Sequence, residues 1–506
     1  MTTRIQLLLV VIPAVALFLA ACGVAAVPQA TMVPTATTAP TATLPPTAVP
    51  TATAIPTPTP PPLAERIFVA GVDIGGLTYE EARTRLEQEL TPLLRPLDIR
   101  AGDRQFTLRA EDINLTIAID EMLATAASRT AGARIPLDLA YDADLLQQQL
   151  HALRNNVRIP AELEVITATN SISRSFVLRG GADIDLAEAE RLIDERLRAP
   201  GAPRRITLTL SAGAAGDDRP TPAALQQQLD AMAEAWPGVA GVYVYDLQSR
   251  QPIAAVHERT VFNAASTIKT VIMLHAYANL DTFSPAQEAA LDKMIIDSDN
   301  LAANALLSWA VGRPGTEGAI VGANSMSDML ADFGLENTYQ YAPYESADFI
   351  RLNNLRIRAG PQRAGEPPYT DTGRYLRTTP YEMAQIYRMI EACSRGEGEL
   401  IEIFADTLNA ERCAEMITRL EANADDTRLV AGLPPGTVAA HKSGWIDDMQ
   451  ADAGIIRTSG GDYIVTIYVY RELPAVGTAI PDRVMKETLA GFSHLIYSYY
   501  NPTLAE

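Results

Sequence analysis

The chain has 506 residues, with 41 basic side chains against 61 acidic ones and a formal net charge of −20. This length exceeds that of one ordinary domain and predicts two or three, each with its own core. The acidic balance argues against a nucleic-acid-binding protein, because phosphate recognition needs clustered positive charge. The five histidines and three cysteines are too scattered for zinc-ligand spacing, so we expect neither a metal nor a cofactor.

Lysine is rare in this chain, because the basic residues include only Lys269, Lys293, Lys442 and Lys486 besides arginine. A lysine that is stripped of water can lose its proton near neutral pH, which arginine does not do. Chance explains any one of the four. Lys269 and Lys442, however, lie in the short motifs described below, so we single out these two.

Residues 1–22 are typical of an export signal. Arg4 supplies a short positive region, and the apolar run from Ile5 to Leu19 is too short for a membrane span. The ending Leu19-Ala20-Ala21-Cys22 resembles the bacterial lipobox, in which the cysteine is acylated and becomes the mature N-terminus. The resemblance implies an exported protein that is lipid-anchored through Cys22 at the outer face of the cytoplasmic membrane. An ordinary signal peptide with an incidental cysteine is the alternative.

Residues 23–62 are almost wholly Ala, Thr, Pro and Val, with 11 prolines between Pro28 and Pro62. Such a stretch cannot form a core and favours extended polyproline II, at roughly 3.1 Å per residue. Its ~35 residues would reach on the order of 100 Å if fully extended. We therefore expect a disordered linker that lets a tethered protein work in the cell wall.

Residues 63–212 are predicted to form an α+β module with a weak internal repeat. Gly71-Val72-Asp73-Ile74 and Gly181-Ala182-Asp183-Ile184 each precede a helical stretch, and capping boxes are expected at Thr78/Glu81 and Asp185/Glu188. The β-type runs include 163–169, 176–178 and 206–210. No catalytic-looking triad of polar residues stands out here.

The opening 71–78, Gly-Val-Asp-Ile-Gly-Gly-Leu-Thr, resembles the peptidoglycan-binding module that precedes L,D-transpeptidase and VanW-type domains. The resemblance covers roughly 150 residues and implies association with the cell wall. A purely structural spacer is the alternative.

A second folded region is expected from about Thr221 to the C-terminus. The runs 239–247 and 252–257 predict an antiparallel hairpin. The sequence Ser266-Thr267-Ile268-Lys269 then precedes an apolar helical run, 270–279. Lys269 lies one helical turn after Ser266, so its amine is within reach of the serine oxygen. A partly desolvated lysine can activate a serine as a nucleophile, although most isolated Ser-x-x-Lys sequences are a helix cap and a surface lysine.

Two further motifs follow in the same region. Ser284-Pro285-Ala286-Gln287 predicts the start of a helix that leads to Asp297-Ser298-Asp299-Asn300, a polar break before the apolar helix 301–311. Near the C-terminus, a strand carries His441-Lys442-Ser443-Gly444-Trp445. Two more strands, 451–457 and 463–470, would complete a meander, and a final amphipathic helix is expected over 482–499.

The motifs Ser-x-x-Lys, Ser-Asp-Asn and Lys-Ser-Gly, in this chain order, resemble the active-site signature of class A β-lactamases and penicillin-binding proteins. The resemblance covers residues 221–506. It implies an α+β fold of the β-lactamase type, with an antiparallel sheet flanked by helices and a helical lobe, next to the separate N-terminal α+β module.

The resemblance implies catalytic roles for Ser266, Lys269, Ser298 and Lys442. Ser266 would attack the carbonyl of a β-lactam or a D-Ala-D-Ala stem, and Lys269 would accept its proton. Ser298 would pass a proton to the departing nitrogen. Lys442 would hold the substrate carboxylate.

The same resemblance implies four substrate-binding residues: Asn300, Ser443, Gly444 and Trp445. Asn300 would bind the substrate amide and Lys269, and Ser443 would share the carboxylate with Lys442. Gly444 would let substrate approach the strand edge. The backbone N–H groups of Ser266 and Trp445 would form an oxyanion hole.

The Glu-x-x-Leu-Asn motif that carries the deacylation base in class A enzymes is not evident. Leu352-Asn353 occurs, but Phe349 stands where glutamate is expected. Spacing favours none of the nearby acidic residues, which are Glu345, Asp348, Glu366 and Asp371. Thr379 and Glu382 then predict a capping box at the start of the following helix.

Cys393 and Cys413 are the remaining thiols. An exported protein permits a disulfide between them, and their separation can be bridged. Two buried free cysteines are equally compatible with the sequence.

Three functional hypotheses follow. The first is a β-lactamase-like serine hydrolase that opens β-lactams through an acyl-enzyme. The second is a D,D-carboxypeptidase or related penicillin-binding enzyme that acts on peptidoglycan stems; the missing glutamate and the wall-binding module favour it. The third is a non-catalytic wall-binding lipoprotein, against which the intact motifs count. The expected partners are the β-lactam or stem peptide, the cell wall and, through the lipid anchor, the membrane.

Overall fold

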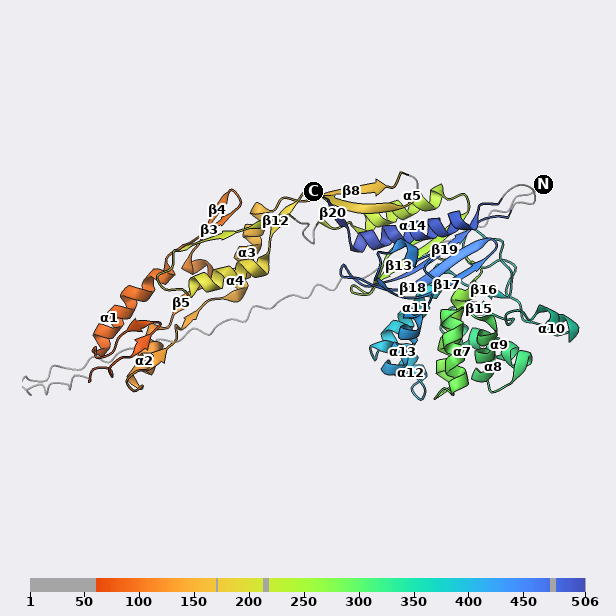
Figure 1. The fold of residues 1–506 in the computed structure, drawn as a ribbon, viewed down its shortest axis with the longest axis horizontal. Helices are drawn as coiled ribbons and strands as arrows, with labels where there is room; N and C mark the ends of the chain where they lie inside the picture. The colour runs from red at the N-terminus through yellow and green to blue at the C-terminus, as the bar shows by residue number, and fades with distance from the viewer. Residues whose placement is uncertain (1–60, 170–171, 213–217, 474–478, 506) are drawn as a thin grey trace, which may run out of the picture. The chain divides into compact units, whose positions relative to one another are not determined.

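The computed structural model describes residues 61–505, apart from 170–171, 213–217 and 474–478 (Figure 1). The expected export signal, Cys22 and nearly all of the proline-rich linker fall in residues 1–60, outside the described residues. Residues 61–506 group as one compact unit. Within the described part of the chain, no helix has both the length and the apolar character that a membrane span requires.

The N-terminal region is built from short strands and four helices around one apolar core. Leucine and isoleucine side chains from all four helices and from the strand pair β3–β4 meet in that core. The bounds of its helices and of its strands are α1 Tyr79–Leu90, α2 Ile119–Ala127, α3 Ala143–Val157 and α4 Leu186–Leu197, with β1 Phe68–Val69, β2 Val72–Asp73, β3 Leu97–Ala101, β4 Arg104–Leu108, β5 Thr116–Ile117, β6 Arg134–Ile135, β7 Leu139–Ala140, β10 Ala182–Ile184, β11 Arg205–Leu208 and β12 Leu210–Ala212.

Of the helix starts predicted to have a capping Glu or Gln, those at Thr78/Glu81 and Ser284/Gln287 form complete capping boxes. Thr78 and Glu81 bond reciprocally at the start of α1. Asp185 caps α4, but Glu188 pairs with Arg191 instead of returning to the cap. At α11, Pro380–Ser394, Thr379 accepts a hydrogen bond from the backbone N–H of Glu382, whose carboxylate binds Asn337 and Thr338. The boxes predicted at Asp185/Glu188 and Thr379/Glu382 were therefore wrong, because each glutamate side chain binds a partner other than the N-cap backbone.

The hairpin of β8, Glu162–Thr167, and β9, Arg174–Arg179, packs with the C-terminal part of the chain. The last strand, β20, Thr503–Ala505, runs parallel to β9. Phe176 is fully buried in the same cluster as the long C-terminal helix α14, Asp482–Tyr500. The expected module boundary at residue 212 thus differs from the packing, because β8 and β9 precede residue 212 and yet pack with the C-terminal part of the chain. A β-type run in the sequence does not indicate which core the strand will join.

The C-terminal region is centred on a five-stranded antiparallel sheet with the order β14-β13-β19-β18-β17. The expected hairpin and meander are present, and the pairing of the hairpin shifts register once, between Val244 and Tyr245. These strands are β13 Val239–Asp246, β14 Gln251–Val256, β17 Val438–Ile446, β18 Met449–Arg457 and β19 Tyr463–Tyr470. Because β17 is the edge strand, one side of its backbone is open to other parts of the chain.

Helices cover both faces of this sheet. Figure 1 shows α5, Pro222–Ala235, and α14 on one face, with the helical lobe on the other. Alternate residues of β13 divide accordingly, since Val242 and Val244 pack with α5 and α14 while Tyr243 faces the lobe. The lobe contains α6 Lys269–Asn279, α7 Pro285–Ile296, α8 Asn300–Ala310, α9 Gly315–Asp332, α10 Ala347–Leu352, α11, α12 Glu399–Ile403 and α13 Ala410–Glu421, with the short strand pair β15 Tyr339–Gln340 and β16 Leu376–Arg377.

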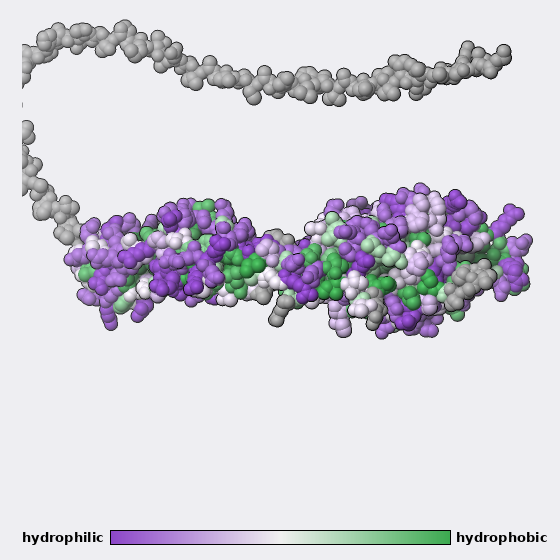
Figure 2. Space-filling view, turned by 90° about the horizontal axis from the view of Figure 1, so that it is seen from above, coloured by the Kyte–Doolittle hydropathy of each residue, from purple (hydrophilic) through white to green (hydrophobic). Residues whose placement is uncertain are grey.

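Helix α6 is the centre of the lobe, and every residue from Lys269 to Ala278 is buried. Because the helix is buried on all sides, most of its side chains are apolar, and the sequence shows a nearly continuous hydrophobic run here. On the viewed side of the molecule, Figure 2 shows mostly hydrophilic side chains, with apolar residues in small separate patches.

Cys393 of α11 and Cys413 of α13 form a disulfide, with their Cα atoms 5.7 Å apart. Replacing both cysteines by alanine should lower the free energy of unfolding by about 3 kcal/mol, the loop-closure value for a ring of this size. Urea denaturation of the full chain and of the double variant measures this difference. An unchanged unfolding midpoint would show that the cross-link does not stabilise the lobe.

Candidate active site

Ser266 lies in a tight 3₁₀ turn, Ala265–Ile268, immediately before α6. The preceding residue, Ala265, has φ +44°, in the left-handed region. The Thr267 hydroxyl donates to the carbonyl of Ala264 at 2.6 Å and lies 2.9 Å from the Tyr468 hydroxyl in the sheet. The turn is therefore anchored to the sheet on one side and to α6 on the other, and it presents Ser266 between them.

Lys269 is fully buried and directly bonded to Ser266. Its Nζ lies 3.0 Å from the Ser266 Oγ, 2.7 Å from the Asn300 Oδ1, and 2.6 and 3.2 Å from the carbonyl and hydroxyl oxygens of Ser298. Burial and, to a lesser extent, the charge of Lys442 lower the pKa of Lys269 to about 7. A substantial fraction of this amine is therefore neutral at physiological pH.

The hydrogen bonds also orient the lone pair of the neutral amine. The carbonyl of Ser298 and the amide oxygen of Asn300 can only accept, so they use two N–H bonds of Lys269. The third position of the nitrogen is then left for the two hydroxyls, that of Ser266 at 3.0 Å and that of Ser298 at 3.2 Å. This arrangement can take a proton from Ser266 and so activate it as a nucleophile.

The Ser298–Asn300 segment joins α7 to α8 and closes the site from the lobe. Ser298 has φ +58°, and Asp299 caps α8 by accepting from the backbone N–H of Ala302 at 2.7 Å. With the cap in place, Asn300 begins α8 and turns its side chain toward Lys269. The strained backbone at Ser298 is what places both its carbonyl and its hydroxyl on one amine.

The edge strand β17 forms the opposite wall. A Cβ added to Gly444 would lie 2.8 Å from the backbone nitrogen of Ser266 and 2.9 Å from that of Thr267. Only glycine allows this approach of two backbones. Trp445 follows with 58% of its surface exposed.

Lys442 is buried within a polar network below the strand. Burial lowers its pKa to about 8, although the carboxylates of Asp452 and Asp425 work in the opposite direction. Burial would raise the pKa of Asp425, but a hydrogen bond from Ser443 and the charge of Arg428 lower it to about 2. The Nδ1 of His441 lies 2.9 Å from Asp452. Lys442 therefore keeps most of its positive charge at neutral pH. It lies beside the turn 265–268 that carries Ser266, the nucleophile turn.

Of the four acidic candidates for a deacylation base, Glu345 contacts the site. Its Oε1 accepts from the Asn300 Nδ2 at 2.9 Å. Asp348 pairs with Arg351 at 84% side-chain exposure. The backbone N–H of Glu366 bonds to the Arg259 carbonyl, and that of Asp371 lies 3.3 Å from the Tyr470 hydroxyl.

Tyr344 is a site residue that the sequence did not reveal. Its hydroxyl donates to the Ala265 carbonyl at 2.7 Å, and its ring centroid lies 4.6 Å from the Lys269 Nζ. Burial raises its pKa well above the ordinary value, although a side-chain hydrogen bond with Ser266 works in the opposite direction, so the phenol stays neutral. No motif surrounds this tyrosine, and only its position next to Glu345 could have singled it out.

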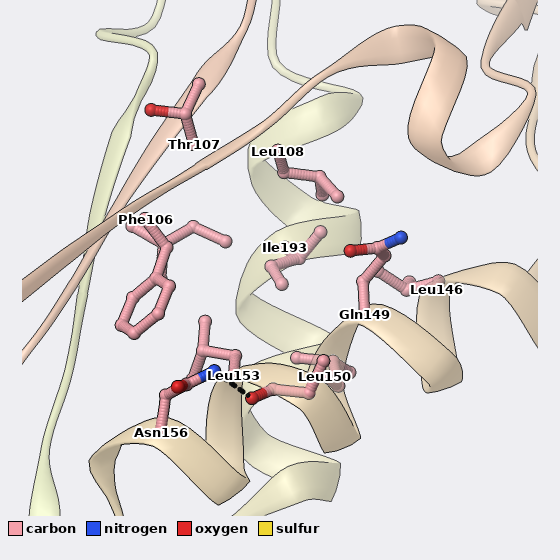
Figure 3. A pocket seen from close by; sticks show the side chains of 11 residues that line it. Phe106, Thr107, Leu108, Leu146, Gln149, Leu150, Leu153, Asn156 and Ile193 are labelled. Carbon is pink, nitrogen blue, oxygen red and sulfur yellow. Dashed lines mark hydrogen bonds between the residues drawn. The ribbon is translucent and has the colours of Figure 1, made fainter.

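The N-terminal region holds a cavity of a different kind. It measures about 250 Å³ and lies between β4, α3 and α4 (Figure 3). Phe106, Leu150 and Ile193 line it with other apolar residues and a few uncharged polar ones, and none of the lining residues is titratable.

Among the described residues, no cluster of three or more His, Cys, Asp or Glu side chains could hold a metal ion. Ser266, Lys269, Ser298 and Asn300 meet between β17 and the lobe.

Comparisons with solved structures return class A β-lactamases and a penicillin-binding protein. A reconstructed class A β-lactamase of the last common ancestor of Gram-negative bacteria is 21% identical, covering 54% of this chain and 98% of its own, with a TM-score of 0.40. PBP-A is 22% identical over 55% and 96%, with a TM-score of 0.41. A class A β-lactamase representative from Bacteroides cellulosilyticus is 15% identical over 56% and 99%, also at 0.41. No curated protein matches the chain.

A family model described as the β-lactamase enzyme family matches residues 224–284 and 285–500, more than half of the chain. The matched segments contain the nucleophile turn, the Ser298–Asn300 loop and the β17 strand described above. The chain belongs to the β-lactamase enzyme family.

Proposed function

We propose that this protein opens β-lactam rings through an acyl-enzyme on Ser266. The single observation that carries the proposal is the 3.0 Å contact between Ser266 and a buried Lys269 whose pKa is lowered to about 7. A base with a pKa near the working pH is the most effective one for taking a proton from a weak nucleophile. The contact needs no rearrangement to begin the reaction.

Each wall of the site has a part in the acylation step. As the Ser266 oxygen bonds to the lactam carbonyl, its proton passes to Lys269, and the oxyanion accepts hydrogen bonds from the backbone N–H groups of Ser266 and Trp445. The close approach of Gly444 to Ser266 supports this pairing. When the C–N bond breaks, Ser298, which lies 3.2 Å from the Lys269 Nζ, relays a proton to the departing nitrogen. Lys442 and Ser443 bind the substrate carboxylate.

Deacylation needs a second base, and Glu345 is our candidate. Its carboxylate shares Asn300 with Lys269, so it lies one side chain away from the amine that activates Ser266. Its φ of +54° is a conformation that a non-glycine residue rarely adopts without structural constraint. From this position, Glu345 can activate a water for attack on the acyl-enzyme.

A D,D-carboxypeptidase or related penicillin-binding activity is the second candidate. The group beside Ser266 and Lys269 within the lobe is the neutral Tyr344 phenol, which is a poor base at neutral pH. The Glu345 carboxylate is held on the exposed amide nitrogen of Asn300. If water cannot use Glu345, a penicillin would acylate Ser266 and remain bound. A non-catalytic protein is disfavoured, because the Ser266 and Ser298 hydroxyls both lie within hydrogen-bonding distance of the Lys269 amine.

We further propose that the enzyme is exported and lipid-anchored through Cys22, and that residues 63–212 associate with the cell wall. The proposal rests on the lipobox-like sequence and on the resemblance of residues 71–78 to wall-binding modules. A tether of the proposed length would let the hydrolase reach peptidoglycan stems.

Nitrocefin and a fluorescent penicillin distinguish the candidate activities of the full chain. Rapid nitrocefin turnover supports the β-lactamase activity, and lasting covalent label without turnover supports the penicillin-binding one. The Ser266→Ala variant should lose both signals, because it lacks the nucleophile. Either signal persisting in that variant, or neither appearing in the folded wild type, would contradict the proposal.

The acylation rate should depend on pH as a narrow bell. It rises as Lys269 loses its proton near pH 7, and it falls as Lys442 loses the charge that binds the carboxylate near pH 8. Lys442→Arg keeps a positive charge to higher pH, so its alkaline limb should move upward while the acid limb stays in place. Stopped-flow labelling with fluorescent penicillin measures both limbs. A flat wild-type profile between about pH 5.5 and pH 9 would refute the roles that we assign to Lys269 and Lys442.

Cys22→Ser should release the protein from the membrane fraction, because it removes the proposed site of acylation. Immunoblots of membrane and soluble fractions give the distribution, with the otherwise identical wild type as control. Equal membrane retention of the two proteins would rule out anchoring through Cys22.

A further inference from the structure

The residue before the nucleophile is held in a conformation that it does not prefer. Ala265 has φ +44°, where its Cβ crowds the backbone, and its side chain is buried. Glycine would adopt this φ without strain. An external constraint must therefore keep Ala265 left-handed, and a flip of this residue would turn Ser266 away from Lys269.

Both backbone polar groups of Ala265 are bonded by side chains. Its N–H donates to the Asn263 Oδ1 at 2.8 Å, and its carbonyl accepts from the Tyr344 hydroxyl at 2.7 Å. Asn263 is a near neighbour on the same loop, whereas Tyr344 comes from a segment almost eighty residues later. The tyrosine thus ties the turn to a separate part of the fold.

Tyr344 is itself fixed to α8. The side chain of Asn304 donates to the Tyr344 carbonyl at 2.8 Å and accepts from the Tyr344 N–H at 2.9 Å. One helical turn earlier, Asn300 binds the Lys269 amine. A single rigid helix therefore positions the base through Asn300 and the nucleophile turn through Asn304 and Tyr344.

We propose that Tyr344 is a positioning residue that holds Ala265 in its left-handed conformation and thereby keeps Ser266 aimed at Lys269. This inference rests on the proposed function, because its consequence is the rate at which Ser266 is acylated. The phenol stays protonated through the working pH range, since burial raises its pKa, and it therefore remains a donor.

The direct test is Tyr344→Phe, which removes the hydroxyl and keeps the ring over Lys269. The first-order acylation rate by fluorescent penicillin should fall about tenfold to a hundredfold, the effect of a misplaced reacting group. The pH profile should be unchanged, because Lys269 keeps its surroundings. Tyr277→Phe is the matched control. Tyr277 lies on the same helix as Lys269, but its hydroxyl accepts a hydrogen bond from Arg419 and is away from Ser266. Its acylation rate should equal that of the wild type.

A second substitution tests the route through Ala265. Glycine at position 265 adopts φ +44° without the hydrogen bond from Tyr344. Ala265→Gly in the Tyr344→Phe background should therefore raise the acylation rate at least about threefold. If the tyrosine had a purely structural role, Ala265→Gly would not raise the acylation rate of the Tyr344→Phe variant. The Cβ chemical shift of Ala265 in the Tyr344→Phe single variant should also move away from its left-handed value.

The outcomes separate the inference from the function on which it rests. A folded wild type that neither turns over nitrocefin nor reacts with fluorescent penicillin would refute the proposed function. A labelled wild type with an unimpaired Tyr344→Phe variant would overturn the positioning role alone. An impaired Tyr344→Phe variant that Ala265→Gly does not rescue would show that the phenol acts on something other than Ala265, and it would equally overturn the inference.

Discussion

The site depends on the burial of one ammonium group. Removing Lys269 from water disfavours its charged form, and the nearby charge of Lys442 adds to that effect, so the pKa falls to about 7. Its oxygen neighbours from Ser266, Ser298 and Asn300 keep the nitrogen in place in either protonation state. An exposed lysine at the same spacing from Ser266 would stay protonated and could not have the role of base that we propose for Lys269.

The rest of the fold serves to close this small volume. The edge strand β17 approaches from the sheet, and Gly444 permits backbone contact with the nucleophile turn. Helix α8 approaches from the lobe with Asn300 and Asn304 on consecutive turns. Because sheet and lobe come from distant parts of the chain, the site exists only in the folded protein, and a disulfide joins α11 to α13 within the lobe.

Much of this arrangement could be predicted from the sequence, because the motifs carry local geometry. A Ser-x-x-Lys spacing places two side chains one turn apart, and apolar β-type runs separated by turn residues predict the meander. Tyr344 and the choice of Glu345 among four acidic residues could not be predicted. They lie in a segment with little regular structure, where contacts are set by the surrounding fold and no periodicity records them. The β8–β9 hairpin was misassigned for a similar reason, since Phe176 has its partners at the other end of the chain.

The most direct test of the account is the protonation of Lys269 itself. With four lysines in the chain, NMR titration of ζ-¹⁵N-labelled protein, assigned with the Lys269→Arg variant, can follow this nitrogen alone. The account predicts a midpoint near pH 7 for Lys269. A midpoint close to the ordinary lysine value of about 10.4 would mean that the amine stays charged beside Ser266, and it would contradict the proposed mechanism.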